Sequence, residues 1–327
     1  MLVEIKDLKK HFKVGKNQYV KAVDGVSFNI KEGQTYGLVG ESGCGKSTTA
    51  RMLIRLIEPT SGSILFNGID LVNISKKELW QQRKNIQMVF QDPYASLHPK
   101  MKIIQSLMEP LNIYNIGTKN ERERKAKEML EIVGLDEKYA DRYPHEFSGG
   151  QRQRICIARS LMLNPKLVIL DEAVSALDVS IQSQILNLLK KLQKEFNLTY
   201  LFISHDLSVV NYLCDEVSVM YLGKIVEQGN VDQVFEETSH PYTKSLLSAI
   251  PSTDIKQKRD RIILRGDVPS PANPPSGCGF RTRCPLAEDI CKEVPPFVEV
   301  GEGHFSRCSL IEKYKREMET NEVPTNS

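Results

Sequence analysis

The fold is decided by a glycine-rich stretch, Gly40-Glu41-Ser42-Gly43-Cys44-Gly45-Lys46-Ser47. Two glycines frame four residues and are followed by Lys-Ser, which is the pattern of a phosphate-binding loop, or P-loop. A short apolar strand is expected at 35–40 and a helix from Ser47, so backbone N–H groups and a helix N-terminus would surround one anion. We therefore expect residues 40–48, Thr48 included, to bind a nucleotide. Lys46 would contact its β- and γ-phosphates, and the Ser47 hydroxyl would ligate Mg²⁺.

A second motif lies about 125 residues further on, where an apolar run ends in two carboxylates. The run at 167–170 predicts a buried strand of a parallel sheet, and Asp171 and Glu172 follow it. Asp171 is placed to hold Mg²⁺ through water. Glu172 is placed to polarise the attacking water as a general base.

Strands and helices alternate along most of the chain, which predicts an α/β fold with a mainly parallel sheet, a P-loop NTPase. Strands are expected at 2–8, 26–30, 64–71, 200–204 and 217–221, and helices at 181–196 and from 207. The region 99–150 has a helical pattern with an amphipathic helix at 119–133, and another helix begins near Gln151. This helical block is an insertion into the α/β fold.

Bulk composition excludes several classes of protein. The 327 residues include 44 Lys and Arg against 41 Asp and Glu, without the basic excess of a typical nucleic-acid binder. No apolar run reaches the roughly 18–20 residues of a membrane-spanning helix. Glu4 and Asp7 stand where a signal peptide would be apolar, so a reducing cytoplasm is expected. Without an internal repeat, one nucleotide-binding module is expected per chain.

The stretch Ser148-Gly149-Gly150-Gln151 resembles the signature motif of ABC ATPases, with Phe147 where that family commonly has Leu. The other motifs of the family follow in order. Phe12 resembles the A-loop aromatic that stacks on adenine, although a core role for Phe12 stays open. Gln91 resembles the Q-loop glutamine, which also reaches Mg²⁺; Asp178 lies in a D-loop-like Ser-Ala-Leu-Asp; and His205 resembles the switch histidine.

The resemblance implies an ABC-type nucleotide-binding domain with a RecA-like core, an N-terminal antiparallel β subdomain and a helical insertion. It implies that Glu172, His205, Gln91 and Lys46 act in catalysis. It also implies that residues 148–151 of one subunit cap the γ-phosphate held by a partner's P-loop, in a head-to-tail dimer. One departure is Ala173-Val174, where the family usually has Pro followed by Thr or Val.

Three further stretches resemble the oligopeptide/dipeptide importer subfamily, and its F-type subunits in particular: residues 91–99, residues 240–251 and the proline-rich stretch before Cys278. The resemblance implies an ATPase that energises peptide import from the cytoplasmic face of the cell membrane. Its partners would be a D-type paralogue, two transmembrane permease subunits and, indirectly, an extracytoplasmic peptide-binding protein, with no nucleic acid. Import of nickel or another small solute, or a soluble ABC ATPase without a transport role, are the alternatives.

Four of the seven cysteines, Cys278, Cys284, Cys291 and Cys308, fall in one short region. They are separated by five, six and sixteen residues, whereas zinc ribbons usually carry a pair separated by two to four. Four thiolates at wide spacing suit a 4Fe–4S cluster, and the importer resemblance points the same way. Zinc and unliganded thiols remain the alternatives.

These patterns divide the chain into three parts. Residues 1–253 form the nucleotide-binding domain, with a helical subdomain at about 95–150. Residues 254–311 form a Cys-rich C-terminal region, expected to be irregular because four prolines lie between Pro269 and Pro275. Residues 312–327 form a charged tail.

Overall fold

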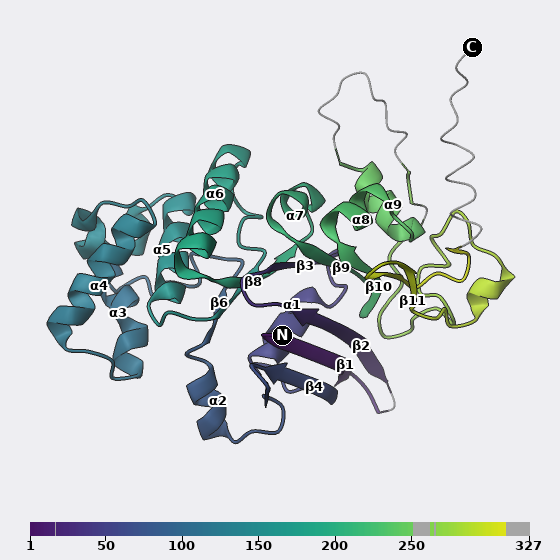
Figure 1. Ribbon diagram of the computed structural model, residues 1–327, viewed down its shortest axis with the longest axis horizontal. Coiled ribbons are helices and arrows are strands. Elements are labelled where there is room, and N and C mark those ends of the chain that lie inside the picture. Colours follow the sequence, from purple (N-terminus) through teal and green to yellow (C-terminus); the bar gives the residue numbers. More distant parts are fainter. Residues whose placement is uncertain (17, 251–261, 265, 312–327) are drawn as a thin grey trace, which may run out of the picture. The chain divides into compact units, whose positions relative to one another are not determined.

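The computed structural model describes residues 1–16, 18–250, 262–264 and 266–311 (Figure 1). Contacts between Cα atoms group the chain into two compact units. The first contains residues 1–2, 30–35 and 73–203, and the second contains residues 3–29, 36–72 and 204–327. The expected domain boundary at 253/254 and the expected tail at 312–327 lie outside the described residues.

The first unit contains a buried parallel sheet in the order β8-β7-β6. Its strands are β6 (Ile86–Val89), β7 (Leu167–Asp171) and β8 (Thr199–Ser204), and Leu167 pairs with Ile86 on one side and Thr199 on the other. Every residue of β7 and β8 is buried. This burial on both faces explains the continuous apolar run at 167–170 and confirms the expected parallel strand.

Helices form the rest of the first unit. They are α2 (Lys76–Gln82), α3 (Ile103–Ile113), α4 (Lys119–Ile132), α5 (Gly149–Leu161) and α6 (Val179–Phe196), with 3₁₀ turns at Glu137–Asp141 and Pro144–Glu146. Figure 1 shows α3, α4 and α5 gathered together. The buried side chains Ala126, Met129 and Leu130 follow the helical spacing expected for 119–133. The helical insertion predicted from the sequence is therefore present.

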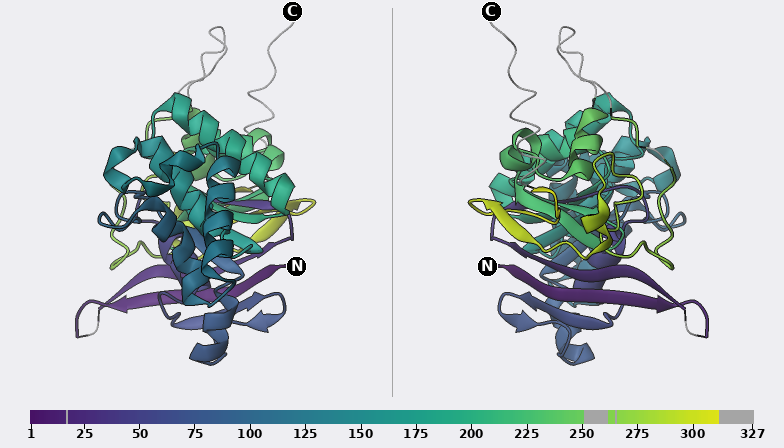
Figure 2. Two further views of the ribbon diagram at one scale, coloured as in Figure 1. Left: turned by 90° about the vertical axis from the view of Figure 1, so that its left-hand side faces the viewer. Right: turned by 90° about the vertical axis from the view of Figure 1, so that its right-hand side faces the viewer.

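The second unit begins with an antiparallel sheet in the order β2-β1-β4-β5. Its strands are β1 (Val3–Lys13), β2 (Tyr19–Ile30), β4 (Ser61–Phe66) and β5 (Ile69–Asp70). Figure 2 shows β1 and β2 as long neighbouring ribbons. β1 runs five residues past the expected end at residue 8; its pairing with β4 ends with Lys9 opposite Ser61, and β2 is its neighbour on the other side. The expected N-terminal antiparallel subdomain is confirmed.

A second sheet of this unit has the order β11-β12-β10-β9-β3. Its strands are β3 (Thr35–Val39), β9 (Glu216–Tyr221), β10 (Lys224–Asn230), β11 (Val298–Gly301) and β12 (His304–Ser306). The accompanying helices are α1 (Lys46–Leu53), α7 (Leu207–Leu213), α8 (Val231–Glu236) and α9 (Pro241–Ser248), with a 3₁₀ turn at Asp289–Lys292. The expected irregular character of 254–311 is not confirmed, because β11 and β12 are strands paired onto β10.

A buried carboxylate ties these last elements together. Glu227 on β10 is 0% exposed. Its side chain accepts hydrogen bonds from the Ser239 and His240 backbone N–H groups at 2.6 and 3.2 Å, and it contacts His304 Nε2 at 2.9 Å. Because His304 lies on β12 and His240 precedes α9, one residue joins three segments of the second unit. No helix in the described ranges is long and apolar enough to cross a membrane.

Candidate functional site

The P-loop lies in the second unit between β3 and α1. Gly40 and Gly45 have φ of 147° and 110°, and a Cβ atom at either position would lie 2.2 Å from a backbone oxygen, of Met220 and Ala22 respectively. Only glycine fits both requirements, so the loop backbone can pack closely and turn its N–H groups inward. α1 begins at Lys46, which confirms the strand–loop–helix context expected from the sequence.

Lys46 is held inside the P-loop. Its side chain is buried, with the residue 4% exposed, and Nζ donates hydrogen bonds to the carbonyl oxygens of Gly40 at 2.7 Å and Glu41 at 3.1 Å. The Cys44 thiol lies 3.8 Å from the same Nζ atom, and burial raises the pKa of this thiol. Cys44 is thus a small buried loop residue, and the ammonium group is positioned by backbone carbonyls.

The two carboxylates of the second motif lie in the first unit, at the end of β7. Asp171 is the last strand residue and is 3% exposed. Glu172 follows with φ of 50°, an unusual conformation for a residue with a side chain. Its backbone N–H donates to Ile203 at 3.0 Å, and its carbonyl accepts from the N–H and hydroxyl of Ser175 at 3.1 and 3.0 Å. The surrounding bonds therefore stabilise a strained backbone that aims this side chain.

Gln91 and Glu172 are brought into direct contact. Gln91 follows β6 in the same unit, and its Nε2 atom donates to Glu172 Oε2 at 2.8 Å. An amide donor on one oxygen fixes the orientation of the carboxylate that the sequence predicts to accept a proton. Asp178, which lies in the stretch that resembles a D-loop, is the exposed N-cap of α6.

The signature-like stretch forms the N-terminus of α5 in the first unit. This helix begins at Gly149, two residues before the expected start. The reason is a capping box in which Ser148 Oγ accepts from the Gln151 N–H at 3.3 Å and Gln151 Oε1 accepts from the Ser148 N–H at 3.0 Å. Ser148 and Gly149 are exposed, whereas Gly150 is buried against Ile181 of α6. An exposed helix N-terminus is suited to an anion that comes from outside the chain.

The two remaining predicted residues, Phe12 and His205, lie in the second unit. Phe12 on β1 is 38% exposed, with Lys10 Nζ 5.0 Å from the centre of its ring. This exposure argues against the core role left open by the sequence. His205 is exposed and lies between β8 and the N-cap of α7. The roles of both residues stay predictions.

The four C-terminal cysteines are all free thiols. Burial, together with smaller contributions from the charges of neighbouring cysteines of the set, raises the pKa of Cys284 to about 11 and that of Cys308 to about 12. The thiols therefore share one neighbourhood. Among the described residues, however, no group of three or more His, Cys, Asp or Glu could hold a metal ion. The geometry does not support the expected 4Fe–4S cluster, nor its zinc alternative.

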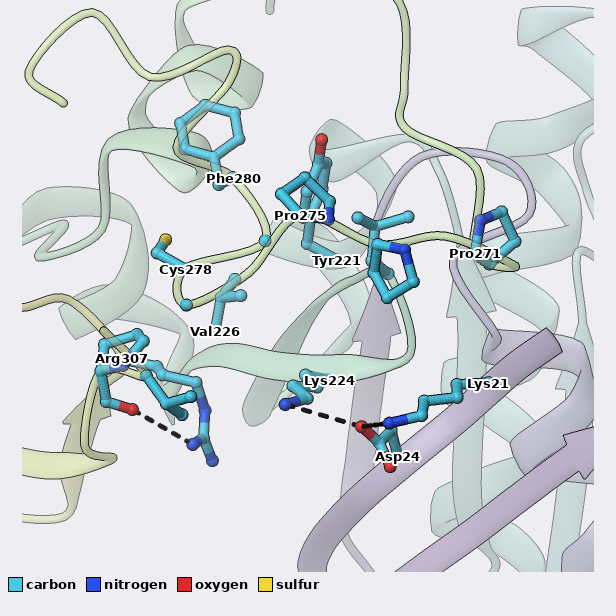
Figure 3. A pocket seen from close by; sticks show the side chains of 16 residues that line it. Lys21, Asp24, Tyr221, Lys224, Val226, Pro271, Pro275, Cys278, Phe280 and Arg307 are labelled. Atoms are coloured by element: carbon cyan, nitrogen blue, oxygen red, sulfur yellow. Dashed lines mark hydrogen bonds and ion pairs between the residues drawn. The ribbon is translucent and has the colours of Figure 1, made fainter. Parts of the chain in front are cut away.

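A pocket of about 200 Å³ lies beside Cys278 (Figure 3). In Figure 3, Lys21 and Lys224 point toward Asp24, at 4.0 and 3.6 Å, while Cys278 and Arg307 lie further along the pocket. Prolines of the Cys-rich region line this pocket together with Lys224 and Val226 of β10.

Two residues near the P-loop could not have been found from the sequence. Arg283 contacts the Glu41 carboxylate, and the Tyr242 hydroxyl accepts a hydrogen bond from the Glu41 N–H. They lie 242 and 201 positions from Glu41, so no local spacing links either residue to the P-loop. The available signals are that Tyr242 falls in the stretch 240–251, which resembles the importer subfamily, and that Arg283 directly precedes Cys284.

Comparisons with known proteins agree with this geometry. Residues 23–175 match the ABC transporter family, and residues 226–291 match the oligopeptide/dipeptide transporter C-terminal region. The oligopeptide transport ATP-binding protein AppF of Bacillus subtilis (strain 168) is 56% identical, over 94% of this chain and 97% of that protein. The dipeptide transport ATP-binding protein DppF of Escherichia coli (strain K12) is 49% identical, over 95% of each.

Solved structures of ATP-binding cassettes share the fold. The dimeric, post-hydrolysis structure of the cassette MJ0796 bound to ADP and Pi has a TM-score of 0.64 and 31% identity, covering 70% of this chain and 98% of that one. The structure of cbiO1 from Clostridium perfringens, part of the cbiONQ ABC transporter complex, has a TM-score of 0.65 and 32% identity, covering 72% and 91%. With its P-loop, its Gln91–Glu172 pair and relatives matching along nearly its whole length, this chain belongs to the ATP-binding proteins of the oligopeptide/dipeptide ABC transporter family.

Proposed function

We propose that this chain hydrolyses ATP to drive peptide import through separate membrane subunits. The observation that carries the proposal is its match to proteins named for oligopeptide and dipeptide transport, which extends through the C-terminal region as well as the cassette. A nickel or other small-solute importer would use the same ATPase. Purifying the intact complex and identifying the bound solute, peptide or metal chelate, decides between them.

Different residues would contact the phosphates, the adenine and the Mg²⁺ of the nucleotide. Lys46 supplies a positive charge for the phosphates, and the Phe12 ring offers a face to adenine. The Ser47 hydroxyl and the buried Asp171 carboxylate are oxygen donors of the kind Mg²⁺ prefers, and Gln91 would complete the set. When bound, Mg²⁺ supplies positive charge that offsets the charge developing on the phosphates.

Glu172 would take the proton of the attacking water, and Gln91 would orient the Glu172 carboxylate through the 2.8 Å hydrogen bond. His205 would assist at the γ-phosphate. Glu172→Gln should abolish turnover, with at least a hundredfold loss expected on the order of general-base contributions, while ATP binding persists. Glu195→Gln, at an exposed position on α6, is the matched control and should keep wild-type turnover. Rapid hydrolysis by Glu172→Gln would refute the general-base assignment.

A closed dimer would complete each nucleotide site. The exposed N-terminus of α5 would cap the γ-phosphate bound to a partner subunit, which we infer to be a D-type paralogue. The relative MJ0796 is itself described as dimeric. In the Glu172→Gln variant, ATP should shift the chain mixed with its paralogue to dimer mass in light scattering. A mass that stays monomeric in saturating ATP would contradict this assembly.

The helical part of the first unit offers a surface for the membrane subunits. Trp80 on α2 packs against Tyr114 with the rings tilted and 4.3 Å between their centres, and Ile113 and Ile116 beside Tyr114 are exposed. Exposed large apolar side chains that lie near one another are typical of a protein contact. We infer that permease subunits dock here and hold the chain at the cytoplasmic face of the membrane. Ile113→Ser with Ile116→Ser should lose co-purification with the permeases but retain ATP binding; co-purification at wild-type level would exclude this surface.

For the four C-terminal cysteines, we infer binding of a 4Fe–4S cluster, with zinc as the alternative, from the sequence spacing alone, because the described residues present no group of three or more metal ligands. Anaerobic purification followed by iron, sulfide and zinc analysis tests this. Iron and sulfide lost in Cys284→Ser but kept in Cys214→Ser, a buried thiol elsewhere in the same unit, would support the cluster. Stoichiometric zinc without iron would refute it.

A further inference from the structure

Glu41, the second residue of the P-loop, is held by two residues from the C-terminal part of the chain. The Arg283 guanidinium contacts both of its carboxylate oxygens, with Nη1–Oε2 at 2.7 Å and Nη2–Oε1 at 3.0 Å. The Tyr242 hydroxyl accepts a hydrogen bond from the Glu41 backbone N–H at 2.9 Å. Both the side chain and the main chain of one loop residue are therefore fixed from outside the loop. All three residues belong to the second unit.

The Arg283 fork is preorganised. The Arg283 side chain is 8% exposed and that of Glu41 is 27% exposed, so this is a partly buried bidentate pair and not a surface ion pair. Arg283 lies on a turn in which the Arg283 and Cys284 N–H groups donate to the Phe280 carbonyl at 2.9 and 3.0 Å. The ring of Phe280 packs against Tyr221 and Tyr242, with ring centres at 5.4 and 5.3 Å. Figure 3 shows Phe280 and Tyr221 beside the pocket that this turn helps to form.

The clamped residue also positions the loop lysine. The carbonyls of Gly40 and Glu41 accept the two hydrogen bonds of Lys46 Nζ, so a shift of residue 41 moves the acceptors of that ammonium group. In addition, a carboxylate on a phosphate-binding loop repels phosphate unless a cation compensates it. Arg283 meets both needs, because it fixes Glu41 and neutralises its charge.

We propose that Arg283 is a positioning residue for nucleotide binding, through which the Cys-rich C-terminal region sets the affinity of the P-loop for ATP. The inference rests on the proposed ATPase function and adds a role for the C-terminal region in it. Loss of the fork leaves an uncompensated carboxylate on the loop. The effect should therefore be larger for ATP than for ADP, which carries less negative charge.

The test measures the Kd of the full-length chain for Mg-ATP and Mg-ADP, together with kcat and KM for ATP hydrolysis. Arg283→Met should weaken ATP binding about tenfold, corresponding to ~1.4 kcal/mol, and raise KM alongside while kcat changes little. Arg283→Lys keeps the charge and loses the fork, so its Kd should lie between those of wild type and Arg283→Met. In the Arg283→Met background, Glu41→Gln should restore most of the affinity, because no uncompensated charge remains.

Arg281→Met is the matched control. Arg281 lies two positions earlier on the same segment and donates to the Ser276 carbonyl at 2.8 Å. Its loss should leave the Kd for ATP unchanged. The positioning role is wrong if Arg283→Met binds ATP as tightly as wild type does. It is also wrong if adding Glu41→Gln fails to restore the affinity although the double variant and wild type have the same unfolding midpoint. If the unaltered chain binds no ATP, the proposed function fails together with this inference.

Discussion

Gly150 offers a test of how tightly the signature-like stretch is packed. It is the second residue of α5, and a Cβ atom added there would lie 2.4 Å from Cγ2 of Ile181 on α6. Real Cβ contacts essentially never fall below 3.0 Å, so Gly150→Ala must separate the two helices by at least about 0.6 Å. Ile181 is β-branched, which leaves its side chain little freedom to rotate away.

Two opposing effects set the magnitude. Overpacking of this kind typically costs about 1–3 kcal/mol. Replacing Gly by Ala in a helix gains at most about 1 kcal/mol, and less than that in a first turn. The expected net destabilisation is therefore about 1–2 kcal/mol. The exposed Ser148 end of α5 should shift as well. ATPase activity should therefore fall by more than the decrease in the folded fraction of the protein accounts for.

The assay is a urea unfolding midpoint together with ATP turnover, and the second-site variant makes it specific. Ile181→Ala removes Cγ2 and should rescue Gly150→Ala. Ile181→Val keeps Cγ2 and should not. The reasoning is refuted if Gly150→Ala is as stable as wild type, or if Val rescues as well as Ala does.

Three further results are expected. Burial lowers the pKa of His240 to about 3 from its ordinary 6.5, so its contribution to stability is full above pH 6.5 and is lost toward pH 3; His240→Asn should flatten the melting temperature over that range. Glu227→Ala strands three donors and should cost roughly 3 kcal/mol or more in urea unfolding, whereas Glu227→Gln should cost less. Phe12→Ala should raise KM for ATP without lowering the melting temperature. Phe28 lies in the core, so Phe28→Ala should lower the melting temperature without raising KM.

Elements with a strong apolar period could be predicted from the sequence. The strand at 167–170 and the helix at 119–133 are both present, because burial on two faces or on one stripe leaves a readable pattern. β12 could not be predicted, because it has three residues and depends on pairing with β10 and β11. The start of α5 was missed by two residues because a capping box, and not an apolar residue, determines it.

In the candidate site, too, local features could be predicted from the sequence and long-range contacts could not. Local motifs predicted Lys46 at the start of a helix, and Asp171 and Glu172 at the end of a strand. The contact between Gln91 and Glu172 spans 81 positions, and that between Glu41 and Arg283 spans 242. Pairings at such separations depend on the completed fold, which no local spacing encodes.

The pairing of β12 with β10 has a consequence for the lifetime of a shortened chain. Gln228 and Glu227 lie opposite Phe305 and Ser306, so β12 occupies the edge that β10 would otherwise present to solvent. A chain cut before residue 304 would leave a row of unsatisfied backbone groups on a strand whose side chains are mostly buried. Such an edge recruits strands from other molecules. We expect proteolytic loss of the last segment to yield insoluble aggregates, and not a smaller cassette that still works.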